Sequence, residues 1–299
     1  MAGRAQPLKA LILGGVAWNT MVYVDAFPGS RPQTVFARGA YETVGSSGAG
    51  KAMNLRHLGA DVTLWGLVGD DEPGQRARRV FEERGIDFVG VIDPLGTTRH
   101  INLMNAAGER ISIFANAGSD TFDVDVAAMA RAAASSDVVS VTILNHCRSF
   151  LPMLEEAGKP IWVDLHDYDG VNQHHDAFIE AADGLLMSST AMPDWRRFLE
   201  RRVAAGTGAA VCTHGSDGAS GLSAEEGWVD VPAVPVDEVI DTNGAGDAFF
   251  AGLVVALHSG APLIDAMNAG AEAASEAIQS PDLAPRPFLR GQRKRASHR

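Results

Sequence analysis

Short, uninterrupted apolar runs constrain the fold of this chain more than any other feature of its sequence. Strands that are apolar throughout are typical of a parallel sheet with helices on both faces, because both faces of such a sheet are buried. The runs cover residues 8–13, 62–68, 138–144, 161–165 and 209–212, and helix-compatible stretches lie between them at 50–58, 73–84, 124–134, 150–157 and 195–205. This alternation predicts an α/β fold of three layers, with a mainly parallel central sheet flanked by helices.

A different pattern interrupts the first one between residues 99 and 115. Apolar and polar side chains alternate there on both sides of a bend at residues 106–109. Alternation of this kind predicts a half-buried antiparallel hairpin. Together with residues 23–44 it could build a small sheet on one edge of the domain, which is either a lid or an ordinary edge hairpin.

The charge balance narrows the classes of partner. The 299 residues carry 25 Lys and Arg against 37 Asp and Glu, a formal net charge of −12, which argues against a general nucleic-acid binder. Six cations and no acid fall in residues 286–299, a composition typical of a disordered tail.

The longest apolar run, residues 248–257, is about half a membrane span, and the start of the chain lacks a signal-peptide core. We expect one domain over residues 1–285, in a soluble, cytoplasmic protein without a membrane or nucleic-acid partner.

The two cysteines cannot form a disulfide framework. Cys147 and Cys212 each lie in an apolar, strand-like run. This placement predicts buried, reduced thiols.

The sharpest chemical signal lies in residues 239–253. A glycine turn leads there into a helix that is apolar almost all round. Gly244, Ala245 and Gly246 offer the unpaired N–H groups of a helix start with little side-chain bulk, so an oxyanion can approach closely. Asp247 in the same turn would repel a phosphate, which makes sense if it takes a proton from a hydroxyl that attacks the phosphorus. The alternative is an acid that only complements the helix dipole.

Residues 241–247, Asp-Thr-Asn-Gly-Ala-Gly-Asp, resemble the D-T-x-G-A-G-D signature of the ribokinase-like (PfkB-type) carbohydrate kinase family. Further similar segments extend over nearly the whole chain: Leu13-Gly-Gly15, residues 58–71, Gly108-Glu-Arg110, Thr213–Gly218 and residues 280–285. The resemblance implies a ribokinase-like fold with a small β-sheet lid from roughly residues 16–44 and 98–115. It also implies transfer of the γ-phosphoryl group of ATP to an alcohol.

The same resemblance implies roles for particular residues. Asp247 would be the catalytic base, and Gly244, Ala245 and Gly246 would hold the migrating phosphoryl group. The ATP site would comprise Thr213, Gly215 and Gly218 along the phosphates, and a helix with Asn268 and Ala271 beside the adenine. Small residues leave room for a flat ring on that helix, but a plain close-packed helix has the same composition. Asp241 and the carbonyl of Asn243 match positions that bind a monovalent cation such as K⁺, and relatives of this kind often pair through the lid into homodimers.

Three departures from the family pattern concern the substrate and Mg²⁺. The N-x-D after the first strand reads Ala17 and Asn19, and Asn19 can still hydrogen-bond a hydroxyl. The sugar loop, usually G-G-x-G-x-N, reads Gly45, Ser46, Ser47, Gly48, Ala49 and Gly50. The N-x-x-E that organises Mg²⁺ reads Ser188 to Ala191 without an acid, so Mg²⁺ would be held mainly by the ATP phosphates and waters.

Lys51 follows the sugar loop and admits several interpretations. Residues 45–51 satisfy the G-x-x-x-x-G-K opening of a Walker A loop, but Ala52 stands where a hydroxyl is needed, and no clear apolar strand ends at Gly45. A loop on the substrate side is favoured instead. Lys51 would then favour a carboxylated or phosphorylated sugar, unless it is an ordinary surface lysine.

Residues 164–176 gather three His and four Asp. Their spacing fits no metal-ligand template, and polar loops commonly follow strands. The loop follows a buried strand at its carboxyl end, where α/β proteins bind ligands, so substrate contacts are the second interpretation.

We therefore predict an ATP-dependent kinase that phosphorylates a hydroxyl of a sugar or sugar-like molecule. An adenosine or other nucleoside kinase is the second substrate class. A nucleotide- or sugar-binding regulator with weakened catalysis, and a non-kinase protein in which residues 241–247 only cap a helix, are the alternatives of other classes.

Overall fold

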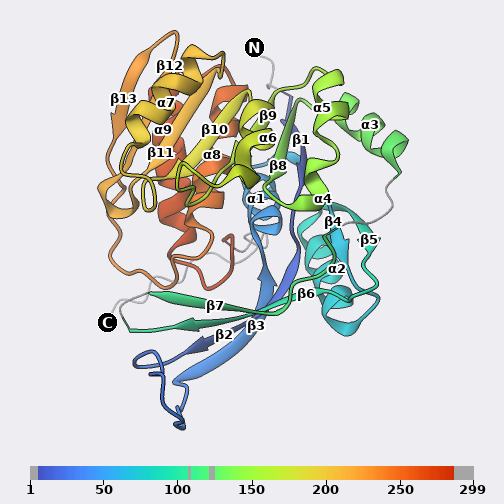
Figure 1. Cartoon of the computed structure of the whole chain (residues 1–299), viewed down its shortest axis with the longest axis vertical. Coiled ribbons are helices and arrows are strands. Elements are labelled where there is room, and N and C mark those ends of the chain that lie inside the picture. Colours follow the sequence, from blue (N-terminus) through green and yellow to red (C-terminus); the bar gives the residue numbers. More distant parts are fainter. Residues whose placement is uncertain (1–5, 107–108, 121–124, 286–299) are drawn as a thin grey trace, which may run out of the picture.

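The computed structural model describes residues 6–106, 109–120 and 125–285. A large sheet of nine strands forms its centre, in the order β13-β12-β11-β10-β9-β8-β1-β4-β5 (Figure 1). Neighbouring strands are parallel except that β12 runs antiparallel to both β11 and β13. The strands are β1 (Lys9–Leu13), β4 (Asp61–Val68), β5 (Asp87–Ile92), β8 (Val138–Thr142), β9 (Ile161–Asp164), β10 (Gly184–Ser188), β11 (Ala209–Thr213), β12 (Ala219–Ser223) and β13 (Gly227–Val231).

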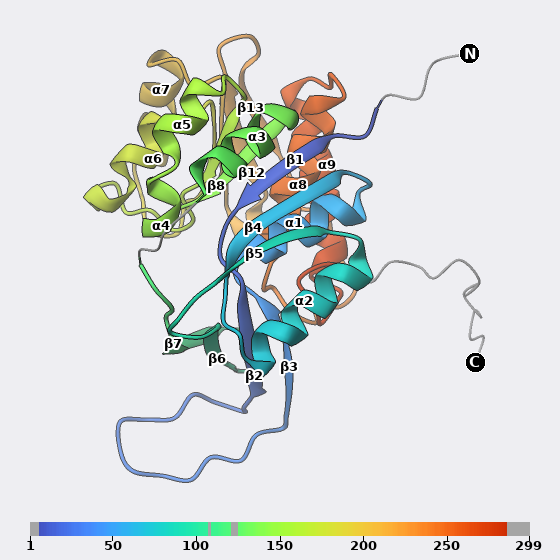
Figure 2. The same cartoon turned by 90° about the vertical axis from the view of Figure 1, so that its right-hand side faces the viewer.

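Helices cover both faces of this sheet and enclose two apolar cores (Figure 2). One core is shared with α1 (Ser47–His57), α2 (Glu72–Arg84), α8 (Ala245–His258) and α9 (Leu263–Ala277). The other is shared with α3 (Val126–Ser135), α4 (Asn145–Arg148), α5 (Leu151–Glu156), α6 (Asp176–Glu180) and α7 (Trp195–Ala204). The three layers are as predicted, and each of the five apolar runs forms a strand of the large sheet. The five helix-compatible stretches correspond to α1, α2, α3, α5 and α7, although residue 124 lies outside the described residues.

A second, smaller sheet lies beyond the carboxyl end of β1 (Figure 1). Its order is β3-β2-β6-β7, with strands β2 (Ala17–Tyr23), β3 (Gly39–Gly45), β6 (Thr98–Met104) and β7 (Arg110–Asn116). The predicted hairpin is β6 and β7, which pair antiparallel, whereas β2 and β6 pair in parallel. Residues 107–108 of its bend lie outside the described residues, as do residues 286–299, on which the prediction of a basic tail falls.

Both cysteines are buried and unpaired, as predicted. Burial raises the pKa of each thiol to about 12, so neither is a reactive thiolate near neutral pH. Within the described ranges, no helix combines the length and apolar character that a bilayer crossing requires.

Candidate active site

The carboxyl ends of the central strands meet the start of α8 at one edge of the large sheet. Parallel strands place these ends on the same side, which is where open α/β sheets bind ligands. A cleft of about 450 Å³ opens there, lined among others by Asp164, Ser188 and Thr213 from the strand ends, Gly246 from α8 and Arg110 from β7. The structure therefore brings together Thr213 and Gly246, which were predicted to share a site from distant parts of the sequence.

The start of α8 has the form expected of an anion-binding helix terminus. Gly244 has a φ of 86° in the left-handed region, which glycine adopts without strain, and α8 begins at Ala245. A Cβ atom added at Gly246 would meet no atom within 4 Å, so this turn borders open space. The N–H of Ala245, predicted to be unpaired, instead donates to the carbonyl of Thr242 at 3.3 Å. Among the described residues the N–H of Gly246 has no such partner, so it can donate to a phosphoryl oxygen.

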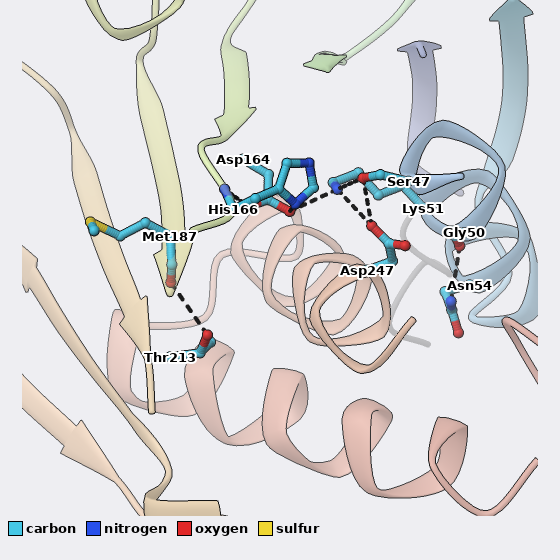
Figure 3. A network of polar contacts seen from close by, with 9 residues as sticks. All are labelled: Ser47, Gly50, Lys51, Asn54, Asp164, His166, Met187, Thr213 and Asp247. Carbon is cyan, nitrogen blue, oxygen red and sulfur yellow. Dashed lines mark hydrogen bonds and ion pairs between the residues drawn. The ribbon is translucent and has the colours of Figure 1, made fainter. Parts of the chain in front are cut away.

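Asp247 lies in the same turn of α8, and its carboxylate is held by residues of α1. Lys51 donates a hydrogen bond from Nζ to Oδ1 of Asp247 at 2.7 Å, and the hydroxyl of Ser47 donates to the same oxygen at 2.8 Å (Figure 3). Among the described residues, no hydrogen bond reaches the other carboxylate oxygen, Oδ2. Asp247 is 8% exposed, so its carboxylate is almost fully removed from water.

The position of Lys51 differs from one sequence-based interpretation. The interpretation of Lys51 as a surface lysine is wrong, because its side chain is completely buried. Its ammonium group also contacts Oδ2 of Asp164 at 2.9 Å and the hydroxyl of Ser47 at 2.6 Å. Burial lowers the pKa of Lys51, but the charges of Asp164 and Asp247 outweigh it and keep the pKa above its ordinary value, so the group stays charged.

Gly50 lets α1 approach the carboxylate of Asp247. A Cβ atom added at Gly50 would lie 2.2 Å from Oδ2 of Asp247, closer than any side chain allows. Ser46, just before α1, has a φ of 78°, a strained value for a residue with a side chain. A strand, β3, ends at Gly45, but it is partly exposed and of mixed polarity, so the absence of a clear apolar strand there is as predicted. The loop is still no Walker A loop, since the Lys51 ammonium is occupied by carboxylates.

The small sheet carries two neighbouring polar side chains, each with a buried atom that lacks a hydrogen-bond partner among the described residues. Asn19 on β2 is 3% exposed, and its Oδ1 atom has no hydrogen-bond partner among the described residues. His100 on β6 lies beside Asn19 in the pairing register, and its Nε2 atom also lacks such a partner. Burial lowers the pKa of His100, so the ring is neutral near pH 7. His100 was not among the residues singled out from the sequence, since its alternating strand carried no motif.

Contacts between the small sheet and residues 241–243 link this sheet to the segment just before α8. Arg110 donates a hydrogen bond to Oδ1 of Asn243, and the hydroxyl of Tyr23 lies 3.5 Å from Oδ2 of Asp241. The Oδ1 atom of Asp241 accepts a hydrogen bond from the Asn243 backbone N–H at 2.8 Å. Burial raises the pKa of Asp241. Arg110 stood in a quoted motif without an assigned role, and its place in the cleft is a finding of the structure.

The loop that was predicted to follow the nucleotide begins where β11 ends. The hydroxyl of Thr213 donates to the carbonyl of Met187 at 3.3 Å, and Gly215 and Gly218 both have positive φ. On α9 the small residues serve helix packing. Ala271 is buried, and a Cβ atom at Gly270 would lie 2.9 Å from the carbonyl oxygen of Phe249 on α8. This is the close-packed helix that the sequence left open as the alternative, and Asn268 on the same helix is exposed.

The residues present fit the phosphates of ATP better than a metal ion held by the protein. Within the described part of the chain, no group of three His, Cys, Asp or Glu side chains could hold a metal, and this includes the His- and Asp-rich residues 164–176. Ser188 and Thr190 instead share a hydrogen bond between their hydroxyls at 2.7 Å.

Asp164 should contribute to stability in a pH-dependent way. Burial raises its pKa, but His166, Lys51 and the hydrogen bonds around it outweigh burial and lower the pKa to about 2, from an ordinary 3.8. A depressed pKa stabilises the fold above about pH 4, by on the order of 2 kcal/mol, and this contribution is lost as the pH falls toward 2.

We expect Asp164→Asn to lower the free energy of unfolding at pH 7, and its difference from the parent chain to shrink below pH 4. Urea unfolding between pH 7 and pH 3 measures this. A difference that is the same at every pH would contradict the assignment.

Comparison with known proteins decides the family. The model of the pfkB family carbohydrate kinases matches residues 16–287 of this chain. The chain belongs to this family. A pfkB family carbohydrate kinase is a phosphotransferase with an alcohol group as acceptor, and this chain is therefore an enzyme of that class.

Two kinds of relative agree with this assignment. The acarbose 7(IV)-phosphotransferase of Actinoplanes sp. is 28% identical over 275 residues, which cover 91% of this chain and 92% of that protein. The structure of the microbiome-derived acarbose kinase Mak1 superposes with a TM-score of 0.82 at 27% identity, covering 92% and 94% of the two chains. Arabidopsis thaliana ribokinase, solved with ribose and ATP, has a TM-score of 0.76 at 18% identity and coverage of 93% and 95%. The pfkB kinase described here thus has the predicted ribokinase-like fold.

Proposed function

We propose that this protein is an ATP-dependent kinase that transfers the γ-phosphoryl group to a hydroxyl of a sugar or sugar-like molecule, with Asp247 as general base. The observation that carries the proposal is the geometry at the start of α8. A buried carboxylate lies in the same helical turn as Gly246, where the backbone borders open space. An anion site and a proton acceptor thus lie within the same helical turn, as phosphoryl transfer to a hydroxyl requires.

In the proposed reaction the acceptor hydroxyl gives its proton to Oδ2 of Asp247, and its oxygen forms a bond to the γ-phosphorus of ATP. The bond between that phosphorus and the bridging oxygen breaks, and ADP leaves. The N–H group at Gly246 would stabilise the charge on the phosphoryl oxygens, because it is fixed before the reaction begins. Mg²⁺ bound to the ATP phosphates would neutralise part of the same charge.

Arg110 is the cation proposed to complete this charge balance. Among the described residues that line the cleft it is the only Lys or Arg, while Asp164 and Asp167 are acidic. Its hydrogen bond to Asn243 holds the guanidinium close to the start of α8. A positive group at this point would stabilise the negative charge on the phosphoryl group during its transfer.

The remaining assignments are proposed on the same basis. Thr213, Gly215 and Gly218 would follow the ATP phosphates from the end of β11, and Asn19 would accept a hydrogen bond from the substrate through its unpartnered Oδ1. A K⁺ site at Asp241 and the Asn243 carbonyl stays a prediction.

A homodimer through the small sheet is supported by β7, where Ile111 and Ile113 are 41% and 47% exposed. We also propose that the protein is located in the cytoplasm.

The proposal is tested by a phosphorylation assay on a panel of neutral sugars, oligosaccharides, acidic sugars and nucleosides. We expect ADP release that depends on Mg²⁺ and on a sugar acceptor, with a phosphorylated sugar formed in equal amount. The similar proteins named for acarbose make oligosaccharides the first group to test. Turnover on nucleosides alone would assign the second substrate class. Binding of ATP and sugar without turnover would contradict the proposal and would instead support a regulator, the alternative that the lack of an acid at Ala191 raised.

A further inference from the structure

Lys51 forms a charged group of three with Asp164 and Asp247, drawn from three elements that are distant in sequence. Asp164 is the last residue of β9 and is 4% exposed, Lys51 lies on α1, and Asp247 lies on α8 (Figure 3). The ion pairs measure 2.9 Å to Asp164 and 2.7 Å to Asp247. Phe250 closes one side, with its ring centre 5.3 Å from the ammonium nitrogen. An isolated buried ammonium is costly, so the two carboxylates are what keep Lys51 inside the protein.

The hydrogen bonds that Lys51 donates limit the role that it can have. An ammonium group has three N–H bonds, and here Ser47, Asp164 and Asp247 accept one each. No N–H bond is left for a carboxylate or phosphate of a substrate. The interpretation of Lys51 as the anchor of an acidic sugar therefore lacks a contact that could provide it.

The hydrogen bonds to Asp247 are unequally divided between its two oxygens. Lys51 and Ser47 both donate to Oδ1, and Ser47 in turn accepts from Lys51. Two donors on one oxygen fix the plane of the carboxylate and leave Oδ2 as the atom that can accept a further proton. A carboxylate held in this way needs no reorientation when the acceptor hydroxyl arrives.

We infer that Lys51 is a positioning residue, which, with Asp164 as its counter-charge, holds Oδ1 of Asp247 so that Oδ2 accepts the proton of the acceptor hydroxyl. This inference rests on the proposed function, because it assigns to Lys51 an effect on the catalytic base. The effect of Lys51 on the reaction passes through Asp247 alone. This effect should therefore disappear when Asp247 can no longer accept a proton.

A double-mutant cycle between Lys51→Met and Asp247→Asn tests the inference. On the parent chain, we expect Lys51→Met to lower kcat by about 10²-fold while KM for ATP and for the sugar change by less than about threefold. On the Asp247→Asn background, the same change should lower kcat by less than about threefold, because the two residues act as one unit. Met53→Ala, a buried change on the same helix that removes none of these hydrogen bonds, is the control and should have the same effect on both backgrounds.

Asp164→Asn is the second variant and keeps the test decisive if Lys51→Met does not fold. It leaves the ammonium in place and weakens its anchoring, so we expect about a tenfold loss of kcat on the parent chain and almost none on the Asp247→Asn background. Equal losses on both backgrounds, or a rise in KM that is confined to acidic sugars, would overturn the inference. An Asp247→Asn single variant with full kcat would instead overturn the proposed function itself.

Discussion

Replacing Asp247 by asparagine should lower kcat by about 10²–10⁴-fold, the range that general-base catalysis contributes. Asparagine has the same shape and can still accept hydrogen bonds from Lys51 and Ser47, so the local packing is kept. It cannot take a proton from the acceptor hydroxyl. The loss should therefore appear in kcat, while ATP binding is retained.

The measurement combines steady-state ADP formation with titration of a non-hydrolysable ATP analogue. Asp265→Asn is the matched control, because Asp265 is an exposed acid in the first turn of α9, away from the cleft. We expect this control to keep the kcat of the parent chain. An unchanged kcat for Asp247→Asn would remove Asp247 from the mechanism.

Replacing Arg110 by methionine should lower kcat by about 10²–10³-fold, the effect of removing one donor to the developing charge of a transition state. Methionine keeps much of the length of the side chain and removes its charge. The hydrogen bond to Asn243 is lost as well, so strand β7 loses one of its contacts with the segment just before α8. The kcat of Arg110→Lys should lie between those of the parent chain and Arg110→Met, because lysine keeps the positive charge but lacks the planar fork of donors.

Arg38→Met provides a control on the same side of the molecule. Arg38 is exposed and pairs with Asp25, in the segment between β2 and β3. If Arg110 acts on the transferring phosphoryl, kcat and kcat/KM should fall together in Arg110→Met and stay unchanged in Arg38→Met. A change limited to KM for the sugar would show that Arg110 only closes the lid.

Much of the fold was predictable because burial leaves a strong pattern in the sequence. The parallel strands β1, β4, β8, β9 and β11 are buried along most of their length, so they appear as continuous apolar runs. The edge strand β5 escaped prediction, since its residues are half-exposed and include Gly90. The antiparallel strands β12 and β13 were also missed, as they are short and contain glycine and polar residues.

The candidate site divides in the same way. The start of α8 was predictable, because the donors, the glycine turn and Asp247 lie within a few residues of one another. The environment of Lys51 was not, because its partners lie 113 and 196 residues further along the chain. Nothing local to α1 shows that a lysine there is buried, and the same holds for Asp164, which reads as the first residue of a polar loop.

The most direct measurement of the central claim is a crystal structure with a non-hydrolysable ATP analogue, Mg²⁺ and a sugar acceptor. The account predicts that the terminal phosphorus lies at the start of α8, with its oxygens within hydrogen-bond reach of the N–H group at Gly246, and with the acceptor hydroxyl between the phosphorus and Oδ2 of Asp247. A terminal phosphorus bound elsewhere in the cleft, with Asp247 out of reach of the acceptor, would contradict it.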